Sequence, residues 1–308
     1  MRKSKYNNAK VLGGSLALGL LLLLAASPFL YPLLGLSLEP PVSNLEAINL
    51  RPGNSFWLGT DALGHDLARM AAWGALGSLS IGLAAAAISV CLGNFLGAAS
   101  ALIGGVVDDI LMRIVDALMS VPSIILLLTL SSLISAPQFT EHWPKPLLSF
   151  LQVTSYSDGL LPYFLVIVSI TATTWLESAR IARARVLTMK QEEYFVAARA
   201  LGGSLLHILR RHLLPALATT AVVEGTLMIA DAIIMESGLS FLGLGLGPST
   251  PSWGSMLRDA QSGLVAGNWW AAIVPGLLIC FAVLSVHLLG EGFLESKKAR
   301  GKISAAKI

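Results

Sequence analysis

The feature that most constrains this fold is a series of long runs without a charged residue. A helix needs about 20 mostly apolar residues to cross the hydrocarbon core of a membrane. Charged residues make up only 13% of the 308 positions, whereas soluble domains carry about 25%. We therefore predict an all-α integral membrane protein with six transmembrane helices. Four charge-free runs and two more broken apolar segments carry this prediction: 11–38, 70–107, 117–140, 159–176, 213–235 and 260–290.

The run at 70–107 is too long for one span, so we expect its first part to lie along the interface or to lead into the helix. Small residues let helix backbones approach closely inside a membrane. The glycines of this run therefore predict close helix–helix contacts: Gly74, Gly77, Gly82, Gly93, Gly97, Gly104 and Gly105.

The distribution of Lys and Arg predicts the orientation. The N-terminus, the segment 177–212 and the C-terminal tail hold four, seven and five of the 21 Lys and Arg. Six spans place these three segments on one side, and loops rich in Lys and Arg are cytoplasmic. We expect a multi-pass protein with both termini in the cytoplasm, divided into 1–69 (tail, first helix and external segment), a core of 70–295 and a basic tail of 296–308.

The segment 177–215 has helical periodicity. Tyr194, Ala197, Leu201, Leu205 and Ile208 recur at three- and four-residue spacing. Gly202-Gly203 divides the pattern into two short helices, and Pro215 stands where the next membrane helix is expected to begin. The apolar face of such a helix pair either lies on the membrane surface or docks into another protein.

The same segment resembles the EAA loop of permease subunits of bacterial ABC importers. Ala197, Ala198, Gly202 and Pro215 match its pattern, and Glu193 lies just upstream. Two positions depart from it, because Val196 stands where Glu is usual and His212 where Ile is usual. The resemblance implies that 177–215 is a coupling loop seated in a groove of a cytoplasmic ATPase subunit.

Four further stretches resemble the dipeptide, oligopeptide and nickel branch of these importers, in its second (C-type) permease subunit. They are GTDALGHD from Gly59, with His65 in place of Arg, DDILMRIVDALMSVP from Asp108, ESGLSFLGLG from Glu236 and PSWG from Pro251. The resemblance implies a type I ABC importer permease fold in the bacterial inner membrane. It also implies four kinds of partner: a homologous second permease, two cytoplasmic ATPase subunits, an external substrate-binding protein and membrane lipid. Di- or oligopeptides are the expected substrates, and nickel chelates, glutathione-like peptides and antimicrobial peptides stay open.

Two groups of charged residues lie within the expected spans. Asp109, Arg113 and Asp116 fall on one helical face and predict a structural ion-pair cluster. Glu224 and Asp231 are two turns apart and share a face, and Glu236 follows near the external end. Acidic groups in a membrane usually face a cavity or a partner charge. This face therefore either lines the translocation path and favours a positively charged substrate, or pairs with Lys or Arg of the partner permease.

Shorter signals concern the external side. Asp61 and Asp66 are expected to cap the start of the second span, and Trp253, Trp269 and Trp270 suit the aromatic belt at the membrane interface.

Several motifs are absent from the sequence. It has no G-x-x-x-x-G-K-[ST] phosphate loop, no H-E-x-x-H and no G-x-S-x-G, and its five histidines show no ligand spacing. We therefore expect neither an enzyme nor a metal site, with ATP and Mg bound by partner ATPase subunits, and the net charge of +3 gives no sign of nucleic-acid binding. The alternative is an ion-gradient-driven secondary transporter or channel. Such folds often carry internal repeats, and none is evident here.

Overall fold

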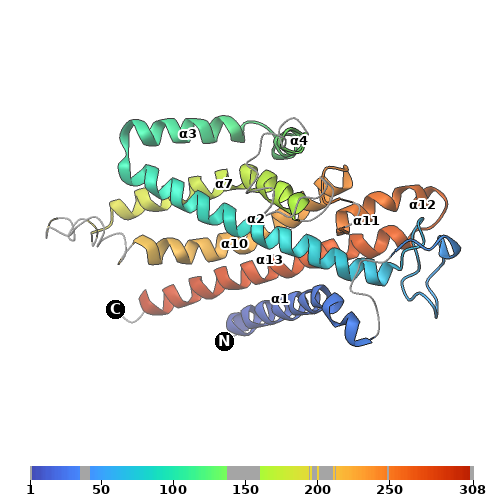
Figure 1. Cartoon of the computed structure of the whole chain (residues 1–308). Helices are drawn as coiled ribbons and strands as arrows, with labels where there is room; N and C mark the ends of the chain where they lie inside the picture. Colours follow the sequence, from blue (N-terminus) through green and yellow to red (C-terminus); the bar gives the residue numbers. More distant parts are fainter. Residues whose placement is uncertain are drawn as a thin grey trace.

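The computed structural model describes residues 2–34, 42–136, 160–193, 195, 200, 211, 213–247 and 250–305, with 2–9, 32–34 and 296–305 described as backbone only. The described residues are helical apart from loops and one isolated bridge between Thr60 and Asp66. The long helices lie side by side in Figure 1, and α1 packs against α13. The long helices are α1 (Arg2–Ala26), α2 (Leu67–Ile103), α7 (Leu161–Lys190), α10 (Leu214–Phe241) and α13 (Trp270–Ala305).

Six membrane spans fit the described helices when one bent pair is counted as a single span. Five helices are individually long and apolar enough to cross a membrane. The sixth span is made of α3 (Gly105–Met119) and α4 (Ser123–Ile134), which meet at an angle of 96°. This span begins earlier than the predicted 117. It breaks before α4 because Pro122 has no N–H to donate and disfavours helical backbone at Val121.

Helix α2 is a single helix of 37 residues, so the first part of the run 70–107 is continuous with the span and leads into it, the second of the two expected alternatives. At 1.5 Å per residue it is about 55 Å long, well beyond the ~30 Å of a hydrocarbon core. Its first turns are packed against α11 (Trp253–Asp259), where a Cβ on Gly74 would lie 2.9 Å from the Trp253 ring. The Asp66 carboxylate caps the helix by accepting a hydrogen bond from Ala68 N at 2.9 Å, which confirms the predicted cap.

Helix α2 makes its most extensive contact with α7, and glycine makes this contact close. A Cβ on Gly93 would lie 2.5 Å from Ser178 Cβ, and one on Gly97 would clash with the carbonyl oxygen of Ala179. The predicted close contact at these glycines is therefore confirmed. Two polar contacts join the same helices: the hydroxyls of Ser89 and Thr174 lie 2.6 Å apart, and Asn94 donates to Ser178 Oγ at 3.0 Å.

The start of α1 lies beside the end of α13. Lys10 Nζ forms ion pairs with Glu291 at 2.8 Å and Glu295 at 3.2 Å, and a Cβ on Gly14 would meet Ser285 O at 2.9 Å. The ends of α7 and α13 and the start of α10 lie at one end of the molecule, on the left of Figure 1. The opposite end carries the loop from residue 42 with η2 (Leu45–Ala47), together with α11 and α12 (Gln261–Val265), while η1 (Ser27–Leu34) continues α1.

We predict that Gly97→Val separates α2 from α7, because the added side chain meets backbone that cannot move alone. Overpacking a well-packed contact costs about 1–3 kcal/mol, and we expect the upper end of this range here. Thermal unfolding of the purified protein in detergent measures the change. Gly13→Val is the matched control, because a Cβ on Gly13 meets nothing within 4 Å. Equal stability of the two variants would contradict the prediction.

Candidate functional site

A cavity of about 480 Å³ lies where the bend between α3 and α4 meets α7 and α10. The bend contributes Pro122 and Ser123, and the rest of the lining is mostly Thr, Met and aliphatic side chains. Two carboxylates line the cavity, Glu177 of α7 and Asp231 of α10, and both side chains are exposed in the isolated chain. The cavity therefore combines an apolar wall with two acidic groups from different helices.

Of the three acidic residues that the sequence placed on the translocation path, Asp231 alone lines this cavity. Glu224 is only 7% exposed and lies beside Ser178 of α7 and Asn94 of α2. Glu224 and Asp231 share a face of α10, but they lie about 10 Å apart along its axis. At the level of Glu224 that face is covered by α2 and α7, whereas at the level of Asp231 the α3–α4 bend leaves space.

Glu236 is fully buried near the opposite end of α10 from Pro215. Its carboxylate accepts a hydrogen bond from Ser240 Oγ at 2.7 Å, one turn later in the same helix. Ser78 of α2 and Ser252 also lie beside it. This environment gives Glu236 a role in packing helices together and no access to the cavity.

Glu177 is not among the residues predicted from the sequence to line the translocation path. It lies in the segment expected to be the start of the cytoplasmic loop, but α7 stays helical through Lys190. The sequence does carry a feature that indicates this position, because Glu177 is the first charged residue after the charge-free run 159–176. A helix that continues past such a run places that residue on the wall of the bundle.

The ion pairs of α3 differ from the predicted cluster. Asp108 is 7% exposed and receives two hydrogen bonds of 2.7 Å from Nε and Nη2 of Arg183 on α7. Asp116 lies 3.9 Å from Arg180, also on α7. Within the described part of the chain, no ion pair of 4.0 Å or less joins Arg113 to Asp109 or Asp116. The acids of α3 are instead held by a neighbouring helix, because the arginines of α7 lie across from them.

Most of the predicted coupling loop lies outside the described residues, namely Val196, Ala197, Ala198, Gly202 and His212. Its two flanks are described. Glu193 is exposed just beyond α7, and Pro215 lies in the first turn of α10, which confirms the predicted start of that helix. Leu213 is buried among Val186 and Met189 of α7 and Ala98 of α2. The two flanks of the loop are thus packed on the end of α2.

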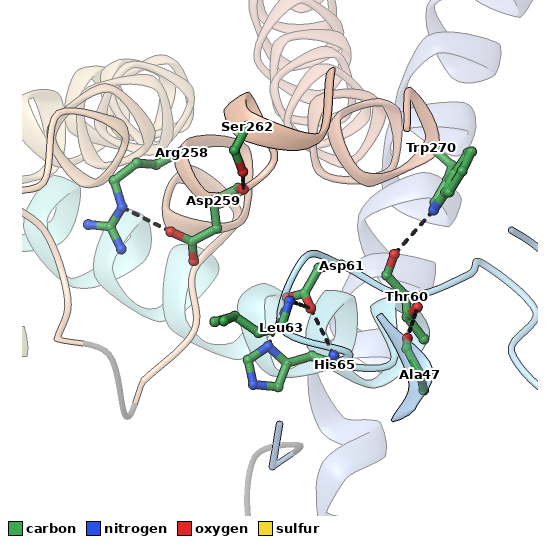
Figure 2. Close-up of polar contacts among 9 residues, drawn as sticks. All are labelled: Ala47, Thr60, Asp61, Leu63, His65, Arg258, Asp259, Ser262 and Trp270. Carbon is green, nitrogen blue, oxygen red and sulfur yellow. Dashed lines mark hydrogen bonds and ion pairs between the residues drawn. The ribbon is translucent and has the colours of Figure 1, made fainter. Parts of the chain in front are cut away.

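At the other end of the molecule, a hydrogen-bonded platform surrounds Thr60 (Figure 2). Its hydroxyl donates to Ala47 O and accepts from Leu50 N, and its carbonyl accepts from Trp270 Nε1 at 3.2 Å. Gly59 has a φ of +80°, and a Cβ there would lie 2.9 Å from the Trp270 ring, so this position requires glycine. The platform therefore joins the loop before α2 to the start of α13.

The turn after Thr60 is organised by Asp61. One carboxylate oxygen accepts from the backbone N–H of Leu63 and His65, and the other lies 2.8 Å from His65 Nδ1 (Figure 2). These bonds tie both ends of a tight turn to one side chain. The turn leads directly to the cap of α2, so the GTDALGHD stretch fixes where that helix begins.

Two of the three tryptophans expected at the membrane interface are buried instead. Trp253 is fully buried, and its indole N–H donates to Ala71 O at 3.1 Å. Trp270 is 4% exposed, and only Trp269, at 57%, is available to the interface. The expectation is wrong for Trp253 and Trp270 because their indole N–H groups find partners inside the bundle, at Ala71 O and Thr60 O.

Comparison with known proteins decides the family. Residues 93–293 match the family model described as "Binding-protein-dependent transport system inner membrane component". The chain belongs to this family. This membership confirms the resemblance drawn from the five motifs and the expectation that the chain is a transport permease subunit and not an enzyme.

Several curated relatives align along most of the chain. A putative peptide permease protein of Brucella suis biovar 1 is 34% identical over 275 residues, which cover 89% of this chain and 82% of the relative. The dipeptide transport system permease protein DppC of Bacillus subtilis is 31% identical, with 96% and 83% covered. The oligopeptide transport system permease protein OppC of Bacillus subtilis is 32% identical, with 82% and 75% covered. The similarity therefore spans nearly the whole permease.

We predict that Thr60→Val loosens the hydrogen-bonded platform around Thr60. Valine keeps the shape but leaves the Ala47 carbonyl and the Leu50 N–H without their buried partner, which costs about 1–3 kcal/mol. Hydrogen exchange of peptides that cover 44–66 should become faster. Ser55→Ala, in the same loop and exposed, should leave exchange unchanged. Undiminished protection in Thr60→Val would show that the hydroxyl does not hold the platform.

Proposed function

We propose that this chain is the second (C-type) permease subunit of an ATP-driven importer of di- or oligopeptides. The observation that carries the proposal is the set of relatives named for peptide, dipeptide and oligopeptide transport, which align over more than four fifths of this chain. The cavity between the α3–α4 bend, α7 and α10 supports it, because a peptide needs a path with both apolar and polar walls.

A homologous second permease completes the path. Glu177 and Asp231 are exposed on the wall of a single chain, and charged groups are costly where they face lipid. A partner that covers this wall encloses them in an aqueous cavity. The sequence has no phosphate loop, so two ATPase subunits bind ATP and Mg and supply the energy, and an external binding protein delivers the peptide.

The cytoplasm lies on the side where α7 ends and α10 begins, together with both termini. The concentration of Lys and Arg in these segments supports this orientation. The connection between the two helices, within 177–215, docks into an ATPase subunit. Its flanks are packed on α2, so a push on the loop reaches the core of the permease.

The charge of the cavity favours substrates with a positive group, such as the free amino end of a peptide. Glu177 and Asp231 contribute two negative charges, and none of the described residues that line the cavity is Lys, Arg or His. Arg180 lies next to the lining, since its Nη1 is 3.5 Å from Sδ of the lining residue Met119. It pairs with Asp116, outside the lining.

Co-expression with the neighbouring genes tests the function. We expect a tag on this chain to recover a second permease and an ATPase from mild detergent, with ATP hydrolysis stimulated by the loaded binding protein. Peptides should stimulate hydrolysis, and nickel chelates should not. A chain that purifies alone while its neighbours are well expressed, and that transports on an ion gradient without ATP, would establish the secondary-transporter alternative instead.

We predict that Ala198→Asp and Gly202→Trp uncouple the complex, because each disrupts the apolar face that would dock into the ATPase. Peptide transport and peptide-stimulated ATP hydrolysis should both be lost, and insertion in the membrane should be retained. Transport assays and membrane fractionation of the same cells measure the two quantities. Normal coupling in both variants would refute the docking role.

We predict that the double variant Glu177→Gln, Asp231→Asn loses its preference for a free amino group. The transport KM should rise about tenfold for a free dipeptide, because a charge-assisted hydrogen bond is lost, and should change little for its N-acetylated form. Asp109→Asn is the matched control, as an exposed acid outside the cavity. An equal rise for both peptides would show that the two acids serve the partner permease and not the substrate.

A further inference from the structure

Helices α3 and α4 form an arm (residues 105–134) attached to α2 through two glycines. Gly104 and Gly105 have φ angles of +71° and +59°, and a Cβ on either would meet nothing within 4 Å. Glycine adopts this left-handed backbone without strain, and the open space around the joint leaves it free to bend. Lys190 of α7 holds the α2 side of the joint by donating to the carbonyls of Ala101 and Leu102. The joint therefore has one fixed side and one free side.

Contacts with α7 determine the position of the arm beyond the joint. Met112 and Val115 of α3 pack on Leu176 of α7 in a small separate core. The opposite face of α3 is open, with Val106 72% and Ile110 55% exposed. Leu111 and Leu118 of α3 and Trp175 of α7 join the same cluster, and polar contacts add to this attachment.

Two arginines of α7 contact α3, one near each of its ends. Near its start, Arg183 forms a bidentate pair with the buried Asp108, both bonds being 2.7 Å long. Near its end, Arg180 lies 3.5 Å from Met119 Sδ and 3.9 Å from Asp116. A planar guanidinium that bonds both oxygens of a carboxylate fixes direction as well as distance. The first pair therefore makes α3 follow any movement of this part of α7.

The bend of the arm is a wall of the cavity. Pro122, Ser123 and Leu126 line it, together with Glu177 of α7. The arm thus reaches from the cytoplasmic end of α7 to the wall around the substrate path (Figure 1). Displacement of α3 is passed to the bend, because only residues 120–122 separate α3 from α4. Helix α4 itself is held in the main core by the fully buried Leu127.

We propose that Asp108 and Arg183 are positioning residues for transport: they couple movement of the cytoplasmic end of α7 to movement of the α3–α4 wall of the cavity, about the Gly104–Gly105 joint. The proposal rests on the proposed ATP-driven function, in which the loop after α7 receives the push. Neither residue touches the substrate. Their loss separates ATP hydrolysis from opening of the path.

The test uses the assembled complex in proteoliposomes with its binding protein. Asp108→Asn and Arg183→Gln should assemble and hydrolyse ATP, but peptide transported per ATP should fall about 5- to 150-fold, the range of typical coupling energies. The exchanged pair Asp108→Arg, Arg183→Asp should recover a large part of this ratio. Matched controls are the exposed neighbours, Asp109→Asn and Arg185→Gln, which should transport at the wild-type ratio.

Two results would overturn the proposal: a wild-type ratio in Asp108→Asn, or an exchanged pair that is no better than the single variants although the complex assembles. A variant that fails to assemble is replaced by Gly104→Val, which stiffens the joint without touching the pair and should lower the same ratio. An unchanged ratio there also overturns the proposal. Failure of the proposed function is distinguishable, because the wild-type complex itself would then show no ATP-dependent transport.

Discussion

The close contact between α2 and α7 is the constraint on which the rest of the structure depends. Inside a membrane no hydrophobic drive pulls two helices together, so small residues and hydrogen bonds must do so. Gly93 and Gly97 bring α2 against the backbone of α7 at Ser178 and Ala179. Because Ser178 and Ala179 face α2, the preceding residue, Glu177, is turned away from that contact and toward the cavity. The packing of two helices thus decides where the carboxylate of Glu177 lies on the cavity wall.

The same packing divides the acids of α10 into two kinds. A polar group withdrawn from water must be hydrogen-bonded or it costs free energy. Glu236 is fully buried and accepts a hydrogen bond from Ser240, and Glu224 is enclosed beside Ser178 and Asn94, so neither of them lines the cavity. Asp231 is exposed on the cavity wall. Helix packing therefore leaves one of the three acids of α10 uncovered at the cavity.

The sequence predicted what depends on hydropathy and local chemistry, and failed where neighbours decide. Charge-free runs indicated six spans, and Pro215 and Asp66 marked two helix ends that the structure confirms. Helical spacing placed Asp116 beside Arg113, but spacing along one helix says nothing about the helix opposite. Arg183 reaches Asp108 from 75 positions away in the chain. The 96° bend between α3 and α4 was not predicted either. The apolar run continues unbroken through Pro122, so hydropathy alone indicates one straight span.

The two ends of the bundle are held by different contacts. At the end that carries α11 and α12, buried indoles and hydroxyls join separate elements: Trp253 bonds to α2, and Trp270 bonds to Thr60 in the loop before α2. Such satisfied buried networks are rigid, because every shift would leave a polar group without a partner. At the other end, α3 leaves α2 through Gly104–Gly105 and one face of it is open. The chain thus has one end where buried polar contacts join α2 and the loop before it to α11 and α13, and another end where α3 packs on α7 with one of its faces uncovered.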